Sequence, residues 1–413
     1  MTALEGRAQP ANAGEKITID PFDDAVLQNP YPVYERLRRD APVLWNEAIG
    51  TWWVSRYEDV FVGLLSDEFS AKTTASQLGI TGEVDLGNFG RTNTLPTTDP
   101  PDHIRLRRIA NRSFLPRAIS DFRPRIETIA NDLLSAAIGA GEVDIVVTVT
   151  ETLPILVIAE LLGVPTSEAA TFKRSSLDMM KAFNGPRMSA DEARRAETAV
   201  RDLEELFESL RIDRQHRPQS DILTTLAEAE ADGAKLSRQE YLATCVLLLV
   251  AGNETTAGSL AAAVYLLGKN PVQYQALKEE PTLVDSATEE ILRILGPVHW
   301  VVRRAKRDTD IAGCTVPAGQ AVSFLLGSAN RDETHFSNPD VFDVARAPSD
   351  HVAFGRGSHQ CLGAPLARAE IQVFLGALLD NCGRIQLVDD HPRWTGSLQS
   401  RSLESVQVSL HKT

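Results

Sequence analysis

The stretch HVAFGRGSHQCLGAPLARAE, residues 351–370, joins a glycine-rich loop to the start of an amphipathic helix. Gly355, Gly357 and Gly363 allow backbone conformations closed to other residues, so the loop can turn tightly and let a flat ligand approach its main chain. Cys361 lies where the helix is predicted to begin. Because a helix N-terminus favours negative charge, we expect the thiolate of Cys361 to be stabilised there. An isolated cysteine more often packs as a small hydrophobe.

The helix after the loop has an apolar face. Its apolar residues recur at helical spacing, and they are Leu366, Ile371, Phe374, Leu375 and Leu378. The loop fills the pattern Phe-Gly-x-Gly-x-His-x-Cys-x-Gly with Phe354, Gly355, Gly357, His359, Cys361 and Gly363. This pattern resembles the haem-binding loop of the cytochrome P450 family. The resemblance implies that Cys361 is the axial ligand of the haem iron and that His359 helps to bind the cofactor.

The composition predicts a large folded protein. With 413 residues, 43% of them hydrophobic, the chain can bury a sizeable core. Its net charge of -14 argues against general binding to nucleic acid, whose phosphate backbone would repel it. The cysteines show no CxxC pairing, which favours reduced thiols over disulfides, and they are Cys245, Cys314, Cys361 and Cys382.

The N-terminal residues 1–18 are small and polar and are predicted to form a mobile arm, followed by a single catalytic domain at 19–413. The first twenty residues lack the apolar run of a signal peptide or an anchor. We therefore expect a soluble, cytoplasmic protein with neither a membrane nor a nucleic acid as its partner.

A long apolar helix is predicted from Ser237 to Gly268, opened by a capping box of Ser237 and Glu240. A membrane span is the alternative, but Asn253 and Glu254 interrupt the apolar run after too few residues to cross a bilayer. A helix that is apolar all round is otherwise buried in the middle of a large domain.

Within this helix, the segment AGNETT at 251–256 resembles the acid-alcohol segment of the cytochrome P450 family. The resemblance assigns catalytic roles to Glu254 and Thr255. The Thr255 hydroxyl can bond to the carbonyl of Ala251, which opens the helix and makes room for dioxygen and water, while Glu254 relays protons from solvent. The pattern is weak by itself, and a core threonine beside a snorkelling glutamate is the alternative.

An arginine-rich helix is predicted after Asp99, its expected N-cap. The segment DPPDHIRLRR, which begins at Asp99, is similar to the family segment that binds the haem propionates, and this assigns that role to His103 and Arg107. A match to RxAxxD gives the same role to Arg303. A solvated basic face is the alternative. An acidic electron donor is expected to dock against the remaining arginines of the segment, which are Arg105, Arg108 and Arg112.

Glu290 and Arg293 form a Glu-x-x-Arg pair on one face of a predicted helix. Most such pairs lie on the surface and stabilise little. This pair lies between the long helix and the cysteine loop, where it resembles the buried ion pair of the family. We therefore predict structural roles for both residues and for Phe354, and we predict that Arg331 fixes the approach to the cysteine loop.

The remaining elements are less specific. Short helices are predicted at 31–39 and 57–65, and strands at 43–45, 51–55, 143–147 and 297–303. The long stretch 70–98 is predicted to be a lid over the active site, in which Arg91 could meet a substrate carboxylate. A loop between two helices is predicted at 182–189, and the turn of a final hairpin that touches substrate at 396–399.

A mainly apolar substrate pocket is expected to be lined by Leu247, Val250, Ala251, His299, Val301 and Leu398. His299 and Val301 alternate toward the same face of a predicted strand, although a lone histidine there is more often packed than a ligand. Such a pocket suits a terpenoid, steroid, fatty acyl or aromatic compound. The sequence does not choose among them.

The resemblance covers nearly the whole chain and predicts a mainly α cytochrome P450 fold, a large helical domain with a smaller β-containing part. It implies heme b (iron protoporphyrin IX) as cofactor and insertion of one oxygen atom from O2 into an apolar substrate, with the thiolate favouring O–O cleavage. No flavin or nicotinamide motif is evident, so a ferredoxin and its NAD(P)H-dependent reductase are expected to supply electrons.

Three alternatives stay open. A nitric oxide reductase of this fold takes electrons directly from NADH, and a peroxygenase uses hydrogen peroxide. The intact pair of Glu254 and Thr255 argues against both, since neither needs this proton relay. The third alternative is a haem-binding sensor or carrier that turns nothing over.

Overall fold

The computed structural model of the protein describes residues 17–72, 84–180, 189–228, 230–231, 234–347, 350–395 and 398–412. Four predictions from the sequence therefore lie outside the described residues, wholly or in part. They concern the N-terminal arm up to residue 16, the centre of the expected lid at 73–83, the loop at 182–188 and the hairpin turn at 396–397.

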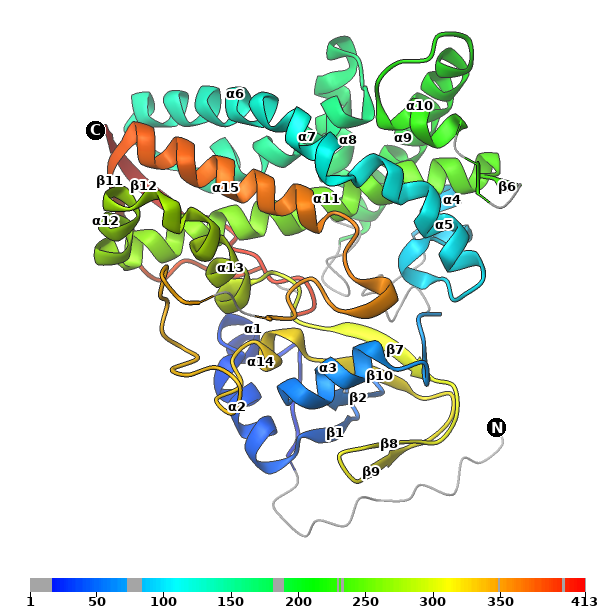
Figure 1. Cartoon of the computed structure of the whole chain (residues 1–413), viewed down its shortest axis with the longest axis vertical. Coiled ribbons are helices and arrows are strands. Elements are labelled where there is room, and N and C mark those ends of the chain that lie inside the picture. The colour runs from blue at the N-terminus through cyan, green and yellow to red at the C-terminus, as the bar shows by residue number, and fades with distance from the viewer. Residues whose placement is uncertain are drawn as a thin grey trace.

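A large helical part and a smaller part built on a sheet make up the described chain, one above the other in Figure 1. This arrangement confirms the predicted mainly α fold. The large part contains α4 (Gly87–Arg91), α5 (Asp102–Asn111), α6 (Pro116–Ala140), α7 (Thr152–Leu162), α8 (Ala169–Met180), α9 (Ala190–His216), α10 (Ile222–Glu228), α11 (Arg238–Lys269), α12 (Pro271–Glu279), α13 (Val284–Leu295) and α15 (Ala364–Asn381). The smaller part contains α1 (Asp24–Gln28), α2 (Tyr31–Asp40), α3 (Tyr57–Leu65) and α14 (Leu326–Ala329).

The sheet of the smaller part brings strands near the N-terminus together with strands from residues 301–324. Its strand order is β1-β2-β10-β7-β3, with β1 (Val43–Asn46), β2 (Thr51–Val54), β3 (Phe69–Ser70), β7 (Val301–Ala305) and β10 (Ala321–Phe324). Strand β1 pairs with β2 as the predicted antiparallel hairpin, and β10 runs parallel to β2. Every residue of β2 is buried, as its β-branched and aromatic side chains favour. The sheet thus holds β7, which carries Arg303, beneath the helical part (Figure 1).

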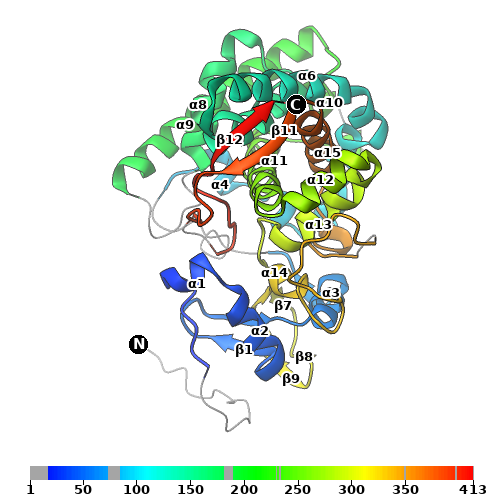
Figure 2. The ribbon, with the colours of Figure 1, turned by 90° about the vertical axis from the view of Figure 1, so that its left-hand side faces the viewer.

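The other strands form small sheets. Strands β11 (Cys382–Leu387), β12 (Gln407–Lys412) and β4 (Glu142–Asp144) make a three-stranded sheet that lies against the helical part in Figure 2. Two hairpins are formed by β5 (Glu230–Ala231) with β6 (Ala234–Lys235), and by β8 (Thr309–Ile311) with β9 (Cys314–Val316).

Helix α11 is the central helix of the large part (Figure 2). The predicted capping box is present, since the Glu240 N–H donates to the Ser237 hydroxyl at 3.2 Å and the Ser237 N–H donates to the Glu240 carboxylate at 2.8 Å. By length and composition α11 could cross a membrane, but 72% of its most apolar window is buried inside the protein. It is the buried core helix that its sequence predicts.

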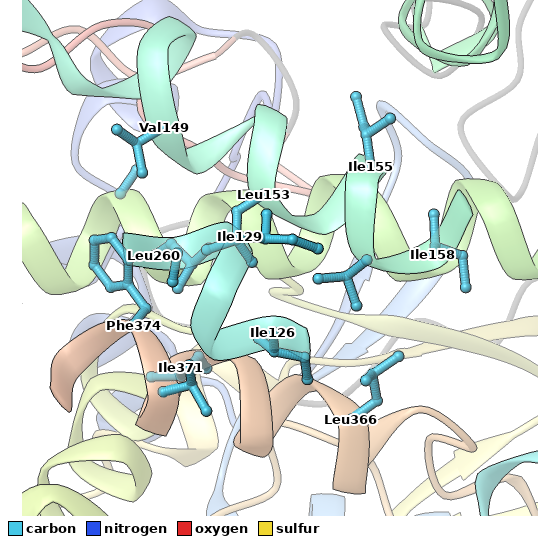
Figure 3. Packing of buried hydrophobic residues seen from close by; sticks show 14 of the residues in the cluster. Ile126, Ile129, Val149, Leu153, Ile155, Ile158, Leu260, Leu366, Ile371 and Phe374 are labelled. Carbon is cyan, nitrogen blue, oxygen red and sulfur yellow. The ribbon is translucent and has the colours of Figure 1, made fainter. Parts of the chain in front are cut away.

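The core around α11 is one continuous cluster of buried apolar side chains. Figure 3 shows Leu260 of α11 among Ile126 of α6, Leu153 of α7 and Phe374 of α15. Because α15 follows directly after Cys361, the packing of α15 in this core fixes where the cysteine loop ends.

Two predicted strands differ from the structure. Of residues 143–147, only the first two belong to β4, because the Asp144 carboxylate accepts the N–H of Val146 at 3.0 Å and turns the chain into a π-helix at Val146–Thr150. In the stretch 297–303, regular pairing begins only at Val301. A local side-chain contact thus ends the first strand, whereas pairing with the distant strand β10 sets the start of the second.

The predicted N-cap of α5 is also different. The helix begins at Asp102, and Asp99 makes no side-chain cap. The Asp99 carboxylate instead accepts hydrogen bonds from the Ser70 hydroxyl at 2.5 Å and from the Ala71 N–H at 2.8 Å. Asp99 therefore ties the end of β3 to the start of α5.

Candidate active site

The cysteine loop has the tight backbone that its glycines predict. Gly355 and Gly357 have φ values of 65° and 75°, a region that favours glycine. A Cβ on Gly357 would lie 2.9 Å from the carbonyl oxygen of Leu64 in α3, so only glycine lets these two segments approach. The loop is closed by the N–H of Cys361, which donates to the carbonyl of Phe354 at 2.9 Å.

Cys361 is exposed to solvent and lines a pocket of about 290 Å³ together with Arg107 and Gln360. Enough protein nevertheless surrounds its sulfur that burial raises the pKa of the thiol. The N–H groups of Gly363 and Ala364 at the start of α15, and the Arg107 guanidinium, lower that pKa. The helix terminus thus acts in the predicted direction, but burial outweighs it in the protein alone. A metal cation at Sγ would remove the proton outright.

A cluster of four basic side chains lies beside the loop. The rings of His103 and His359 are 3.9 Å apart, and Arg107 donates to the carbonyl of Gln360 at 2.6 Å. Burial lowers the pKa of Arg303 to about 10. Burial, and next the charge of Arg303, lower the pKa of His359 to about 3. The cluster therefore gathers two guanidinium charges and two uncharged imidazole rings in a place that is at least half-buried.

The ring of His103 is 2% exposed, and neither of its nitrogens has a hydrogen-bond partner among the described residues. Burial, and then the charges of Arg107 and Arg303, lower its pKa. A buried ring with two unsatisfied nitrogens is costly unless a ligand meets it. A haem propionate would supply the acceptor for the N–H of the ring, and the thiol of Cys361 suits its iron. The residues present therefore fit a haem.

In helix α11, the Thr255 hydroxyl donates to the carbonyl of Ala251 at 2.9 Å, the contact that the sequence predicts. The helix is α-helical from Arg238 to Lys269, so the predicted opening of the helix is absent from this segment, all of which is described. A threonine hydroxyl that bonds back to a carbonyl already bonded within the helix need not break the helix.

Glu254, next to this threonine, has an unusual pKa. Burial raises the pKa of its carboxyl to about 7, and a hydrogen bond from the Ser400 hydroxyl at 3.2 Å opposes that rise. A carboxyl with such a pKa can both accept and release a proton near neutral pH.

One face of α11 is open although the helix runs through the core. Ala251 is exposed, and Leu247 and Thr255 are half-buried. These three residues are spaced four apart, so they share a face of the helix. Val250 is only 8% exposed and contributes little to that face. Leu247 and Ala251 thus lie on this open face, and their role in a substrate pocket stays a prediction.

The structure corrects the assignment of His299 to the pocket. Its side chain is 2% exposed, and Nδ1 lies 3.1 Å from the Tyr34 hydroxyl. Because β7 begins only at Val301, the strand alternation does not extend back to His299. Val301 is half-buried and packs against the core of the sheet. Leu398 is corrected too, since it is 3% exposed in a separate apolar cluster.

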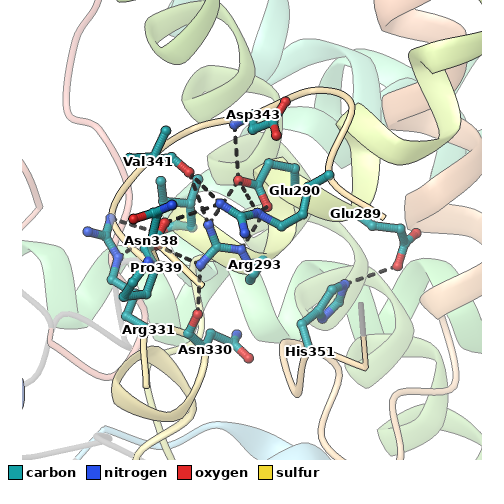
Figure 4. A network of polar contacts seen from close by, with 12 residues as sticks. Glu289, Glu290, Arg293, Asn330, Arg331, Asn338, Pro339, Val341, Asp343 and His351 are labelled. Atoms are coloured by element: carbon teal, nitrogen blue, oxygen red, sulfur yellow. Dashed lines mark hydrogen bonds and ion pairs between the residues drawn. The ribbon is translucent and has the colours of Figure 1, made fainter. Parts of the chain in front are cut away.

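The predicted ion pair of Glu290 and Arg293 is buried. Two hydrogen bonds of 2.7 and 2.9 Å join the side chains, and Arg293 also donates to the carbonyls of Asn330 and Pro339 (Figure 4). Arg331 donates to the carbonyl of Ile294 at 2.9 Å. These contacts tie α13 to the long loop that leads to the cysteine.

Sequence reasoning missed a second network beside this one. Glu289 accepts two hydrogen bonds from Arg368 of α15, at 2.7 and 2.8 Å, and its other contact is the His351 ring at 3.0 Å. The Arg368 guanidinium lies 4.6 Å from the ring centroid of Phe354. Figure 4 shows Glu289 and His351 next to the buried pair. In the sequence, the feature that could have indicated this network was the pair of consecutive glutamates at 289–290.

Two predicted surface roles also change. Arg105 is held by Glu240 of α11 through a short hydrogen bond, so its charge is already compensated. Arg91 of α4 forms an ion pair of 2.5 Å with Asp85. Arg108 and Arg112 are exposed on α5 and just after it.

Comparisons with known proteins agree with this site. The family model of cytochrome P450 matches residues 158–395. The putative cytochrome P450 YjiB of Bacillus subtilis (strain 168) is 37% identical over 369 residues, which cover 88% of this chain and 90% of that protein. CYP109E1 from Bacillus megaterium, solved in complex with testosterone, has a TM-score of 0.82 at 32% identity and is matched over 92% of this chain and 99% of its own.

A further solved structure is P450BioI in complex with an acyl carrier protein ligated to hexadec-9Z-enoic acid. It has a TM-score of 0.85 at 31% identity, over 94% of this chain and 99% of its own. The family match and these relatives place the chain among the haem-dependent oxidoreductases. The chain belongs to the cytochrome P450 family, and it is a monooxygenase.

Proposed function

We propose that the protein inserts one oxygen atom from O2 into an apolar small organic substrate, with heme b as its cofactor. The observation that carries this proposal is that Glu254, whose pKa burial raises to about 7, directly precedes Thr255, whose hydroxyl lies on the open face of α11 and donates to Ala251. A haem bound through thiolate supplies the activation of dioxygen. Cys361 would hold the iron, and His103, Arg107, Arg303 and His359 would hold the propionates.

The chain's own residues have distinct tasks in this reaction. Thr255 keeps its hydroxyl on the open face of α11 because its proton is engaged by Ala251, so its oxygen lone pairs can accept a hydrogen bond from water or substrate. Glu254 can deliver protons one at a time, since its pKa of about 7 leaves both forms populated near neutral pH. Thr255 and Glu254 are therefore the proposed catalytic residues.

The substrate is proposed to be apolar. Leu247 and Ala251 are the apolar members of the open face of α11. Two relatives of this fold are solved with a steroid and with a carrier-bound acyl chain, respectively. Both ligands are largely hydrocarbon, so a steroid or a long acyl chain is the first substrate class to test here.

The electrons are proposed to come from a ferredoxin and its NAD(P)H-dependent reductase, in the cytoplasm. Arg108 and Arg112 are exposed on α5 and just after it, on the helix whose Arg107 lines the pocket beside Cys361. Positive charge on this surface would attract an acidic electron donor. Docking there would shorten the path of the electron to the haem.

The test is a reconstitution with a purified ferredoxin, its reductase and NADPH, after a panel of steroids and fatty acids has been screened by the shift of the haem to high spin. The expected result is one oxygen atom in the product for each O2 consumed. Product formation driven by hydrogen peroxide alone, or NADH oxidation that needs nitric oxide and no ferredoxin, would favour an alternative member of the fold. A haem that binds no small molecule and stays unreduced would favour a sensor or carrier.

A further inference from the structure

The segment just before β12 lies beside the strand-like stretch that follows α13. Ser400 forms an isolated antiparallel bridge with Val298, the His299 N–H donates to the carbonyl of Gln399 at 2.9 Å, and the Arg401 N–H donates to the carbonyl of Pro297 at 2.7 Å. These backbone bonds fix the position and the direction of Ser400.

This segment meets helix α11 at two points. The Ser400 hydroxyl lies 3.2 Å from the Glu254 carboxylate, and a Cβ added to Gly258 would lie 2.6 Å from the Ser402 hydroxyl. Glu254 and Gly258 are four residues apart, so they share a face of α11. Ser400 and Ser402 are two apart and point to the same side of an extended chain. Glycine at 258 therefore permits the close approach that lets Ser400 reach Glu254.

The residue between the two serines anchors the segment on its other side. Arg401 is 2% exposed, and it donates to the carbonyl of Leu27 at 3.0 Å. Its guanidinium lies 3.6 Å from the ring centroid of Trp394. The backbone of Ser400 is thus held between α11 and the N-terminal part of the chain, within hydrogen-bonding reach of Glu254.

We infer that Ser400 is a positioning residue for Glu254: its hydroxyl fixes the orientation of the carboxylate and favours the charged form. The inference rests on the proposed function in one respect, because Glu254 has a catalytic task only in a monooxygenase. The contact itself does not depend on that task.

The surroundings of Glu254 make a single hydroxyl important. Burial raises the pKa of Glu254, and Ser400 is the group that opposes it; no charged side chain among the described residues contributes. Arg401 is the charged residue that directly follows Ser400, and its guanidinium donates to the carbonyls of Leu27 and Gln28. A donor to the carboxylate stabilises its charged form, so loss of the hydroxyl should raise the pKa further.

The test is an infrared pH titration of the carboxyl C=O stretch of Glu254 in the haem-loaded protein, with Glu254→Gln to assign the band. For Ser400→Ala we expect the midpoint to rise by about one pH unit, the size of a single hydrogen bond to a charged group. Ser400→Thr keeps a hydroxyl and should restore the midpoint. Ser402→Ala is the matched control, since the Ser402 hydroxyl has no hydrogen-bond partner among the described residues.

A midpoint that is the same in Ser400→Ala and in the parent protein would overturn the inference, and so would an equal rise in Ser402→Ala. If Ser400→Ala folds poorly, Ser400→Thr and Ser400→Cys provide a second test, because the midpoint should be higher for the weaker donor, cysteine. Equal midpoints in these two variants would also overturn the inference. The titration needs no substrate and no turnover. A protein that shows the predicted midpoints but forms no product would therefore retain Ser400 as the partner of Glu254 and reject only the proposed function.

Discussion

The hydroxyl of Thr255 donates a hydrogen bond to the carbonyl oxygen of Ala251, 2.9 Å away and one turn earlier in α11. This bond holds the only proton of the hydroxyl, so the oxygen remains an acceptor on the open face of the helix. For Thr255→Ala we expect NADPH consumption to continue while product per NADPH falls by about a hundredfold, the low end of what a positioned proton-transfer group contributes. Peroxide release and product are measured together.

Thr255→Ser is the control for that prediction, because it keeps the hydroxyl and loses only a methyl group. It should retain most of the coupling. Equal coupling in the parent protein and in Thr255→Ala would remove Thr255 from the proposed mechanism.

A second prediction concerns Glu254 and stability. Its folded-state pKa of about 7 lies above its ordinary value of 4.5, so the folded protein binds the proton more tightly than the unfolded chain. The charged form therefore destabilises the fold as pH rises from about 4.5 to about 7. Glu254→Gln removes this penalty. Its advantage in unfolding free energy should be absent at low pH and reach on the order of 3 kcal/mol above pH 7. Urea unfolding at several pH values measures it, and a gain that does not vary with pH would contradict the buried-carboxyl account.

A third prediction concerns cofactor retention. His103 has two buried ring nitrogens without a partner among the described residues, in a cluster that fits the haem propionates. His103→Ala should speed the transfer of haem to apomyoglobin by about tenfold or more, since hydrogen bonds to charged groups contribute about 1.5–3 kcal/mol. His391→Ala removes an exposed histidine and should leave the transfer rate unchanged. Equal rates for both variants would place the propionates elsewhere.

A fourth prediction concerns the buried ion pair of Glu290 and Arg293, whose side chains are at most 1% exposed. Glu290→Gln leaves Arg293 buried without its counter-charge, and Arg346 loses the same partner. Breaking such a pair costs about 3–5 kcal/mol, measured by urea unfolding. Asp121→Asn breaks the exposed pair with Arg117 and should cost about 0.5 kcal/mol or less. Similar losses for the two variants would deny Glu290 its structural role.

Local signals predicted the parts of the site that one stretch of chain determines. The glycines around Cys361 and the capping box at Ser237 act within a few residues, and the structure has the tight loop and the helix start that they indicate. The contact of Thr255 with Ala251 was predictable for the same reason, because it lies within one helical turn.

Contacts between segments that are distant in the sequence could not be predicted from these local signals. His299 was assigned to the pocket by strand alternation, but the start of β7 depends on its pairing with β10, and the ring packs against Tyr34 instead. Ser400 and Glu254 are 146 residues apart, and no periodicity in either segment indicates that they meet. Such contacts follow from the packed fold rather than from the local sequence.

The central claim is that Cys361 binds the haem iron as a thiolate. The most direct measurement is the absorption spectrum of the purified protein, reduced and under carbon monoxide. We predict a Soret band shifted far to the red in the parent protein and the loss of that shift in Cys361→His, which still offers the iron a ligand. A band at the ordinary histidine-ligated position in the parent protein, or no bound haem, would contradict the account.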